Sequence, residues 1–321
     1  MASIKAMPNK KRYILVTNDV ETTSIINNRL SESAGNKVLH EGMPRLLELY
    51  SKHDIKTTFF YCGDIVRQHP QCVVLAHENG HEIGSHGWSH EDNEAFDVLS
   101  LDEQIEHITK SKSELERIIQ SEVLSFRAPA LRINDDTCMA LHACGIKVDS
   151  SISPQRLDML LSFGVRRKMK WITANRNPYF VSSKSLFKKG ESNLLEIPVS
   201  AAGFGYIGTT LRVSPGLARI TRYILHMEVM LTGRPIVFLT HPNEFIDETL
   251  DAGAIPKRGN NFISYLLGDK LRRQLKLRNL GKKGIPLLER EIAFFKKKGY
   301  QFITCREYYQ LTLNRQNNAL K

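Results

Sequence analysis

Short runs of β-branched and aromatic residues alternate along this chain with segments that have helical periodicity. Helices are expected at 43–54, 99–120 and 286–299. Strands that alternate with helices are typical of a parallel α/β fold. The number of strands predicts a barrel of the TIM type or a deformed relative of it. The expected strands are residues 13–17, 56–62, 81–85, 123–127, 146–150, 194–199, 236–240 and 300–305.

The chain length of 321 residues fits one such barrel with short extensions. We divide it into a basic N-terminal segment (1–12), a single barrel domain (13–305) with a basic insertion (257–284), and a C-terminal tail (306–321). The first residues lack the apolar core of a signal peptide, and no stretch reaches the roughly 20 apolar residues of a membrane span. The five cysteines have no metal-binding spacing and fit a reducing compartment. We therefore expect a cytoplasmic protein.

Reactive side chains follow several of the expected strands. In parallel barrels, the loops after the carboxyl ends of the strands meet at one rim and build the active site. Side chains that are far apart in the sequence are therefore expected to converge there. Asp19 and Glu21 follow the first strand, His86 and His90 the third, Arg127 the fourth, Asp149 the fifth and His241 the seventh.

The stretch GSHGWSH places His86 and His90 four residues apart. Two imidazoles at this spacing can lie on one face of a helical turn, where both could bind one metal ion. The alternative is a polar surface turn without a ligand. The two histidines directly follow an expected strand, as the other reactive residues do, and this shared position favours a metal site.

These motifs resemble those of the polysaccharide deacetylases, the NodB-homology group that is also called carbohydrate esterase family 4. The resemblance implies a deformed (β/α) barrel that holds one divalent metal, usually zinc, and hydrolyses the amide of an N-acylated amino sugar. GHEIGSHGWSH is the most specific match. The matching stretches are TNDVE (17–21), TTFFYCGD (57–64), GHEIGSHGWSH (80–90), FRAPA (126–130), VDSSIS (148–153) and LTHPNEF (239–245).

Within this resemblance, His86 and His90 are metal ligands and Asp19 is the general base. Many members have two adjacent aspartates in the first motif, whereas here Val20 follows Asp19 and cannot bind a metal. Residues 19 and 21 of a strand project to the same side, so Glu21 is the expected third ligand. If Glu21 faces away, either Asp19 is also a ligand or the site is metal-free. The DVE form resembles a branch of the family associated with surface-glycan assembly.

The remaining site residues are expected to position the base and to stabilise charge. Arg127 would orient Asp19, and Asp149 would hold Arg127 through a forked ion pair; an ordinary structural salt bridge is the alternative. The metal and the backbone N–H of Ala130 would stabilise the oxyanion of the tetrahedral intermediate. His241 would protonate the departing amine.

We therefore expect a metal-dependent hydrolase that removes the N-acetyl group from an amino sugar in a glycan or glycolipid precursor. Three alternatives stay open. The first is a deformylase of a lipid-linked formamido sugar, because formyl and acetyl groups differ by one methyl. The second is a metal-independent hydrolase of a small cyclic amide. The third is a non-catalytic glycan-binding module, against which the joint presence of Asp19, His86, His90, Arg127 and His241 speaks.

The net charge of +11 is concentrated in residues 257–283, with a smaller cluster at 165–170. A local patch of this kind does not predict nucleic-acid binding. In 257–283, apolar side chains are interleaved with arginines and lysines, a mixture that fits an anionic membrane surface. We therefore consider a lipid-linked substrate and peripheral contact with the inner membrane face. The alternative for this segment is a solvated helix that covers part of the barrel.

Overall fold

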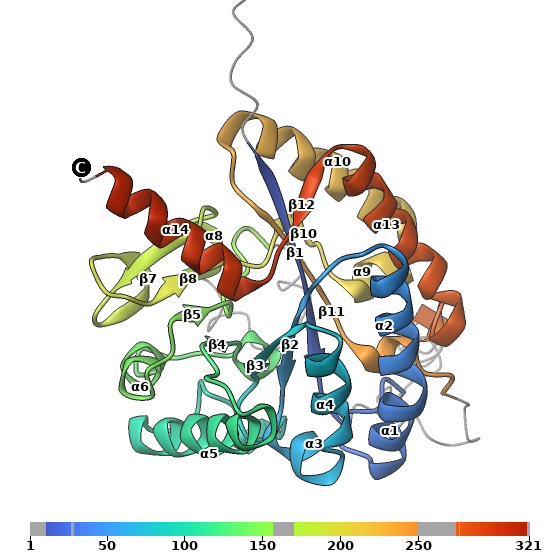
Figure 1. Cartoon of the computed structure of the whole chain (residues 1–321), viewed down its shortest axis with the longest axis horizontal. Coiled ribbons are helices and arrows are strands. Elements are labelled where there is room, and N and C mark those ends of the chain that lie inside the picture. Colours follow the sequence, from blue (N-terminus) through green and yellow to red (C-terminus); the bar gives the residue numbers. More distant parts are fainter. Residues whose placement is uncertain (1–10, 27–28, 157–169, 249–273, 276, 320–321) are drawn as a thin grey trace, which may run out of the picture.

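The computed structural model describes residues 11–26, 29–156, 170–248, 274–275 and 277–319 (Figure 1). All eight expected strands are present, and they form one curled parallel sheet. The expected deformed (β/α) barrel is thereby confirmed. The strands are β1 (Arg12–Val20), β2 (Thr58–Tyr61), β3 (Glu82–Ser85), β4 (Ser125–Phe126), β5 (Val148–Asp149), β8 (Leu195–Glu196), β11 (Ile236–Thr240) and β12 (Tyr300–Phe302).

Strand β1 organises the sheet, because it pairs with three others. It lies parallel to β11 along 14–18, to β2 along 17–20 and to β12 along 12–14. From β2 the order continues through β3, β4 and β5 to β8. Only sparse bonds join the segment after β8 to β11: the Ser200 N–H donates to the Val237 carbonyl (3.0 Å), and Ile207 bridges Leu239. This sparse closure is what makes the barrel deformed.

An antiparallel pair of strands, β6 (Tyr179–Ser182) and β7 (Ser185–Lys189), extends the sheet beyond β8. The strand expectations did not include this pair. A second small sheet joins β9 (Ala201–Ala202) and β10 (Phe204–Gly205). Both additions lie between the fifth and seventh expected strands, where the crossover is not a simple helix.

Helices cover the outside of the sheet, and those expected at 43–54, 99–120 and 286–299 correspond to α2, α5 and α13 (Figure 1). Most of the segment expected as a C-terminal tail forms helix α14. The helices are α1 (Glu32–Lys37), α2 (Met43–Lys52), α3 (Gly63–Gln68), α4 (Gln71–Glu78), α5 (Leu101–Ile119), α6 (Thr137–Ala143), α8 (Lys170–Thr173), α9 (Gly208–Val213), α10 (Pro215–Thr232), α13 (Ile285–Lys297) and α14 (Cys305–Ala319).

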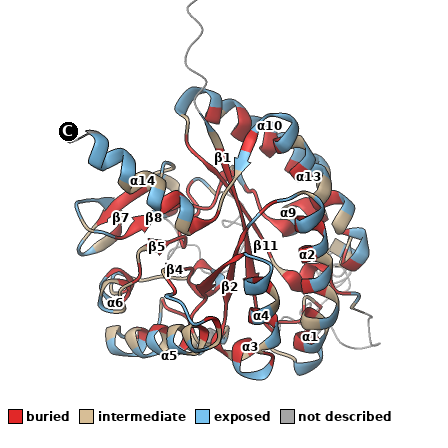
Figure 2. Ribbon diagram, viewed as in Figure 1, coloured by how far each residue is buried: buried red, intermediate tan, exposed pale blue. Residues whose placement is uncertain are grey.

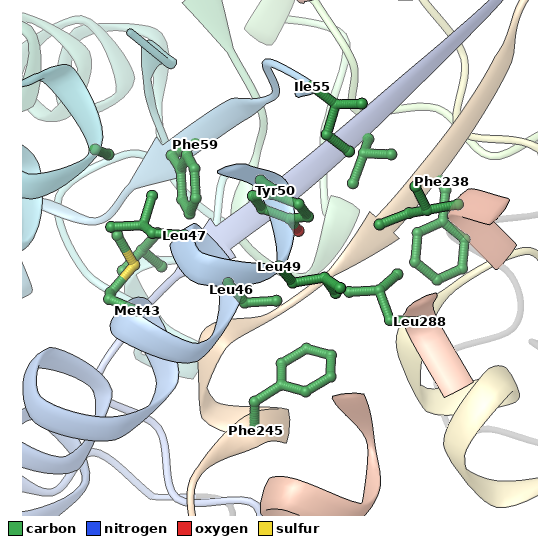
Figure 3. Close-up of a cluster of buried hydrophobic side chains, with 14 of the residues drawn as sticks. Met43, Leu46, Leu47, Leu49, Tyr50, Ile55, Phe59, Phe238, Phe245 and Leu288 are labelled. Carbon is green, nitrogen blue, oxygen red and sulfur yellow. The ribbon is translucent and has the colours of Figure 1, made fainter. Parts of the chain in front are cut away.

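The two faces of β1 belong to different apolar clusters. Ile14 and Val16 face the helices, where α2 supplies much of the packing; Figure 3 shows Leu46, Leu49 and Tyr50 in this cluster. Tyr13 and Leu15 belong to a second cluster with side chains of β4, β5 and β8. Because successive side chains of a strand alternate between its faces, the series of Tyr13 and Leu15 continues into residues 17 and 19. Figure 2 shows the strands buried along this path.

Among the described residues, no helix is both long enough and apolar enough to cross a membrane. The basic segment 257–283, which the sequence suggested for membrane contact, lies mostly outside the described residues. So does most of the smaller cluster at 165–170.

Candidate metal centre

Two carboxylates project into the site from the carboxyl end of β1. Asp19 lies within the strand and Glu21 directly follows it, and both are buried. Asn18 points the other way, where its Oδ1 accepts a hydrogen bond from Tyr50 Oη of α2 (2.6 Å). The alternation of the strand therefore separates a structural polar residue from the two acids.

The histidine stretch forms an irregular loop after β3, not the helical turn that its spacing suggested. Gly87 has a φ of +71°, a left-handed conformation that favours glycine, and this breaks a helical path. The loop is bonded to the end of β2 and the start of α3: His86 N–H donates to Tyr61 O (2.8 Å) and Gly63 N–H to Gly87 O (3.0 Å). Trp88 covers Gly63 so closely that a Cβ there would collide with the indole ring.

Despite the irregular loop, His86 and His90 come together with Glu21. One ligand atom from each of the three residues lies within 4.8 Å of the other two. The two imidazole centroids are 5.9 Å apart, and His90 Nε2 is 2.9 Å from Glu21 Oε2. The structure thus places Glu21 on the side of the histidines, not facing away from them.

Two observations show that these side chains fit a divalent metal. His86 Nδ1 lies 2.7 Å from the Arg127 carbonyl, so that nitrogen donates its proton and Nε2 keeps a lone pair for the site. Glu21 Oε2 is buried and faces His90 Nε2 at 2.9 Å, whereas Oε1 accepts a hydrogen bond from Asn243 Nδ2 (3.3 Å). A buried carboxylate oxygen beside two imidazoles is a donor set suited to a metal.

The protonation states of Glu21 and His86 are those that metal binding requires, whereas the charge and hydrogen bond of Glu21 outweigh burial and raise the pKa of His90. Burial favours the neutral form of Glu21, but the charge and hydrogen bond of His90 outweigh it and lower the pKa of Glu21 to about 2. Burial lowers the pKa of His86 to about 4. At neutral pH Glu21 is therefore ionised and His86 is neutral, as ligands must be.

Asp19 is held by a fully buried arginine. Arg127 Nη1 donates to Asp19 Oδ1 (2.7 Å) and to Thr17 Oγ1 (2.8 Å). The opposite side of the guanidinium is bound by Ser150, through its carbonyl (2.9 Å) and its hydroxyl (2.8 Å). The plane also lies over the Phe60 ring at 4.4 Å. Asp19 Oδ1 is thus fixed, whereas Oδ2 lies 3.8 Å from His86 Nε2 and 4.0 Å from His241 Nε2.

The forked ion pair expected between Asp149 and Arg127 is wrong. Four of the five guanidinium N–H groups donate to Thr17, Asp19 and Ser150, and the ion pair of Arg127 among the described residues is with Asp19. Asp149 accepts a hydrogen bond from Ser151 Oγ (2.6 Å) and shares one with Glu196 of the neighbouring strand β8.

Burial raises the pKa of Asp149 and, with the charge of Asp149 added, raises that of Glu196 well above its usual range. Two neighbouring buried carboxyl groups with raised pKa values stand in place of the expected pair. Glu196 was missed, although a lone glutamate in the apolar run LLEIPV was the signal.

His241 follows β11 and faces the site from the other side of β1. Its Nδ1 lies 3.6 Å from Glu244 Oε2, and its Nε2 points toward Asp19. Burial favours neutral His241, but the hydrogen bond of Glu244 and the charges of Glu21 and Asp19 prevail and raise its pKa to about 9. His241 is therefore protonated at neutral pH. Glu244 was not singled out from the sequence, although it lies in the matched stretch LTHPNEF.

Ala130 lies in a short 3-10 turn (Pro129–Leu131) after β4, with a φ of +51°. The turn packs against the histidine loop, because a Cβ built on Gly87 would lie 3.3 Å from Pro129 Cγ. This places Ala130 at the edge of the site, where its predicted role stays a prediction. His81 lies apart from the site: its Nδ1 accepts the Thr57 N–H (3.1 Å) and supports β2.

Comparison with known proteins gives matches over part of the chain. Residues 9–148 match the family model described as polysaccharide deacetylase. The peptidoglycan deacetylase of Helicobacter pylori is 25% identical over 163 residues, which are 50% of this chain and 53% of that protein. The uncharacterized protein YlxY of Bacillus subtilis is 30% identical over 91 residues, 28% of each chain. The chain thus aligns with about half or less of the length of these curated relatives.

The fold has a counterpart among solved structures. A putative polysaccharide deacetylase from Mycobacterium smegmatis superposes with a TM-score of 0.56 and 19% sequence identity, over 91% of this chain and 93% of that one. At this identity the likeness concerns the fold.

Proposed function

We propose that the chain belongs to the polysaccharide deacetylase family (NodB homology, carbohydrate esterase family 4), whose model matches residues 9–148, and that it is a metal-dependent amidohydrolase. The proposed reaction removes the N-acetyl group of an amino sugar in a glycan or glycolipid precursor. One observation carries the proposal: Glu21, His86 and His90 converge beside a fixed carboxylate, Asp19, and a protonated histidine, His241.

Glu21, His86 and His90 would hold the metal. We propose zinc, because two imidazoles and one carboxylate form a donor set found in catalytic zinc sites. When bound, a divalent cation supplies the Lewis acidity that activates water and polarises an amide carbonyl at neutral pH. The protein must supply the proton transfers and the orientation.

Asp19 is the proposed general base. Its Oδ1 is tied to Arg127 and its Oδ2 is directed to the site, so Oδ2 is the atom that would accept a proton from water. Arg127 keeps this carboxylate in one orientation, since every arm of its guanidinium is bonded. Asp149 would act indirectly: through Ser151 it supports the backbone of Ala128, next to the arginine.

His241 is the proposed general acid. A leaving amine must gain a proton before the C–N bond breaks, and His241 carries one on the Nε2 that faces Asp19. Glu244 on the opposite ring nitrogen would stabilise the charged imidazolium. The backbone N–H of Ala130 is the proposed donor to the oxyanion, because its turn borders the histidine loop.

The acyl group and the location are finer proposals. A deformylase stays a second candidate, because a pocket distinguishes formyl from acetyl by only about 1–3 kcal/mol. We propose a cytoplasmic site of action: all five cysteines are free thiols, which suits a reducing compartment. A lipid-linked substrate that approaches along the basic segment 257–283 belongs to the same proposal.

The test is to incubate the zinc-loaded protein with N-acetylated and N-formylated amino-sugar glycans and to measure released acetate and formate. We expect acetate release that His86→Ala and His90→Ala abolish together with bound zinc. His40→Ala, at an exposed histidine away from the site, is the matched control and should change neither. Formate release alone would support the deformylase. Activity retained in metal-depleted protein would overturn the metal-dependent mechanism in favour of a metal-independent hydrolase.

A further inference from the structure

Helix α10 (Pro215–Thr232) is apolar on both of its faces. Its inner face, which includes Ala218, Leu225 and Val229, is buried against the barrel. Ten large apolar side chains are exposed in the described part of the chain, and six of them lie on α10, so they form one patch. We call these six the α10 patch: Ile220, Tyr223, Ile224, Met227, Met230 and Leu231, with exposed fractions from 43% to 84%.

The α10 patch has helical spacing. Ile220, Ile224, Met227 and Leu231 follow one another at intervals of four, three and four residues, which places them on one stripe. A contiguous exposed apolar surface marks an interaction site. The α10 patch therefore fits a partner that offers an apolar surface or interior.

A cationic cavity of about 350 Å³ lies beside this patch, between α10 and α13. Arg219, Arg222, Arg290 and Lys297 line it, against a single carboxylate, Glu291. That carboxylate is already occupied, because it accepts hydrogen bonds from Arg222 Nη1 (2.8 Å) and from Tyr206 Oη (2.5 Å). The cavity thus has an excess of positive charge.

Arg222 is buried at the cavity and held in one orientation. Arg222 is only 7% exposed, and its guanidinium lies over the Phe294 ring at 4.0 Å. Its Nε has no hydrogen-bond partner among the described residues. An unused donor on a buried, oriented guanidinium is what an anion with several oxygen atoms would bind. The hydrogen bond of Arg219 and the charge of Arg222 also lower the pKa of Tyr223, as expected in a positive potential.

We propose that α10 is a docking surface for an anionic phospholipid bilayer. The phosphate of a lipid headgroup would lie in the cavity between α10 and α13, and the α10 patch would enter the boundary between headgroups and acyl chains. Tyr223 connects the two parts, since it belongs to the patch and its ring lies near Arg219 and Arg222 (centroid distances 6.0 and 5.2 Å).

Charge decides between a bilayer and a second copy of the chain. Two copies that met through α10 would leave the cationic cavity without an anionic partner, because none of the six residues of the α10 patch carries a negative charge. An anionic bilayer offers an apolar interior together with negative charge at its surface, which matches the patch and the cavity side by side.

The docking surface is separate from the candidate metal centre. Arg12, at the amino end of β1, contacts Met230 near the carboxyl end of α10 (Nη1 to Sδ, 3.5 Å), whereas Asp19 lies near the carboxyl end of β1. Substitutions on the outer face of α10 should therefore leave the chemistry of the site unchanged.

The test is cosedimentation of the full chain with vesicles of phosphatidylcholine, alone or mixed with phosphatidylglycerol. We expect binding only to the mixed vesicles. The triple variant R219Q/R290Q/K297Q and the double variant I224S/M227S should each weaken it at least tenfold. The matched control K184Q/K188Q/K189Q removes three exposed lysines from the β6–β7 hairpin, which lies away from α10 in Figure 1, and should bind nearly as the wild type does.

Four outcomes would overturn the proposal. Equal loss of binding in the hairpin control would show that net charge alone acts. Unchanged binding in both α10 variants would place the contact elsewhere. Binding of inorganic phosphate, measured by calorimetry and lost in the cavity variant, would indicate a soluble phosphate ligand if the vesicles are not bound. Light scattering completes the test, because a dimer that I224S/M227S dissociates would identify a second copy as the partner.

Discussion

The two oxygen atoms of Asp19 have different surroundings. Oδ1 is bonded to a fully buried arginine, and Oδ2 lies between the Nε2 atoms of His86 and His241. A carboxylate that is anchored through one oxygen and open through the other can accept a proton without losing its orientation. This asymmetry, more than the presence of an aspartate, supports the role of Asp19 as base.

Asp19→Asn should therefore abolish the base but retain the metal. We expect turnover to fall by roughly 10² or more with zinc still bound, measured by acetate release and by metal analysis. The variant also leaves Arg127 buried without its carboxylate, so we expect a loss of about 3–5 kcal/mol in the free energy of unfolding.

Thr17→Val provides the matched control for Asp19→Asn. It removes a different acceptor of Arg127 Nη1 and leaves the carboxylate in place. We expect only a small loss of turnover from it. A comparable loss in both variants would mean that the orientation of Arg127, and not a proton acceptor, limits the reaction.

Glu21→Gln tests the third ligand. The amide keeps the size of the side chain but loses the charge, so zinc affinity should fall at least tenfold, as measured by competition with a chelator. Asn243→Ala is the comparison, because it removes the neighbour of Oε1 and leaves Oε2 unchanged. Unchanged affinity in Glu21→Gln would return the third ligand to Asp19.

At the scale of elements, the site depends on contacts between β1, β2 and the loop after β3. The loop is irregular, and backbone hydrogen bonds to Tyr61 and Gly63 hold it in place of helical bonds. Its position therefore follows the position of β2. His81 stabilises β2 from behind, because its Nδ1 accepts the Thr57 N–H at the start of that strand.

The stability of the protein should depend on pH through His81. Burial, and to a lesser degree the charge of Lys56, lowers the pKa of His81 to about 4, below the value of about 6.5 in an unfolded chain. Between these values the unfolded chain binds more protons, so stability is complete above about pH 6.5 and declines as the pH falls toward 4.

His81→Asn should flatten this decline. An asparagine can keep an acceptor for Thr57 but does not titrate, so about 2–3 kcal/mol of the change in unfolding free energy between pH 6.5 and 4 should disappear. Urea denaturation at several pH values, with wild type and variant in the same metal state, measures it. His40→Asn, at an exposed position, is the control. An unchanged slope in His81→Asn would mean that His81 does not titrate in this range.

On the scale of the whole molecule, the barrel is joined tightly on one side and loosely on the other. Strand β1 shares long registers with β2 and β11, whereas few bonds connect the segment after β8 to β11. The three candidate ligands come from the residue that follows β1 and from the loop after β3, on the tightly joined side. A metal there would connect two parts of the chain that are about 65 residues apart in sequence.

Metal binding should consequently raise the stability of the whole domain. At a free zinc concentration 100 times the dissociation constant, linkage predicts about 2.7 kcal/mol of added unfolding free energy. Thermal unfolding with and without a chelator measures the shift in Tm. His90→Ala should abolish the shift, and it should also lower the metal-free Tm because it removes the ion-pair partner of the buried Glu21. A zinc-dependent shift that survives in His90→Ala would place the bound metal elsewhere.

The alternation of strands and helices, and with it the barrel, could be predicted from the sequence because periodicity is a local property of the chain. The strand period also predicted that Asp19 and Glu21 share one side of β1, as they do. The two histidines were found from their spacing and their place after a strand. Even so, their expected helical turn was wrong, since Gly87 adopts a left-handed conformation within packed surroundings.

Only the tertiary structure decided which partners the buried polar groups have. The acceptors that bind the donors of Arg127 come from strands that are far away in the sequence. Ser150 accepts hydrogen bonds from Arg127, whereas Asp149 was the expected partner. Glu196 joined Asp149 because β8 lies next to β5. The outward face of α10 is likewise invisible in a sequence, because a helix that is apolar all round does not reveal which side meets the barrel.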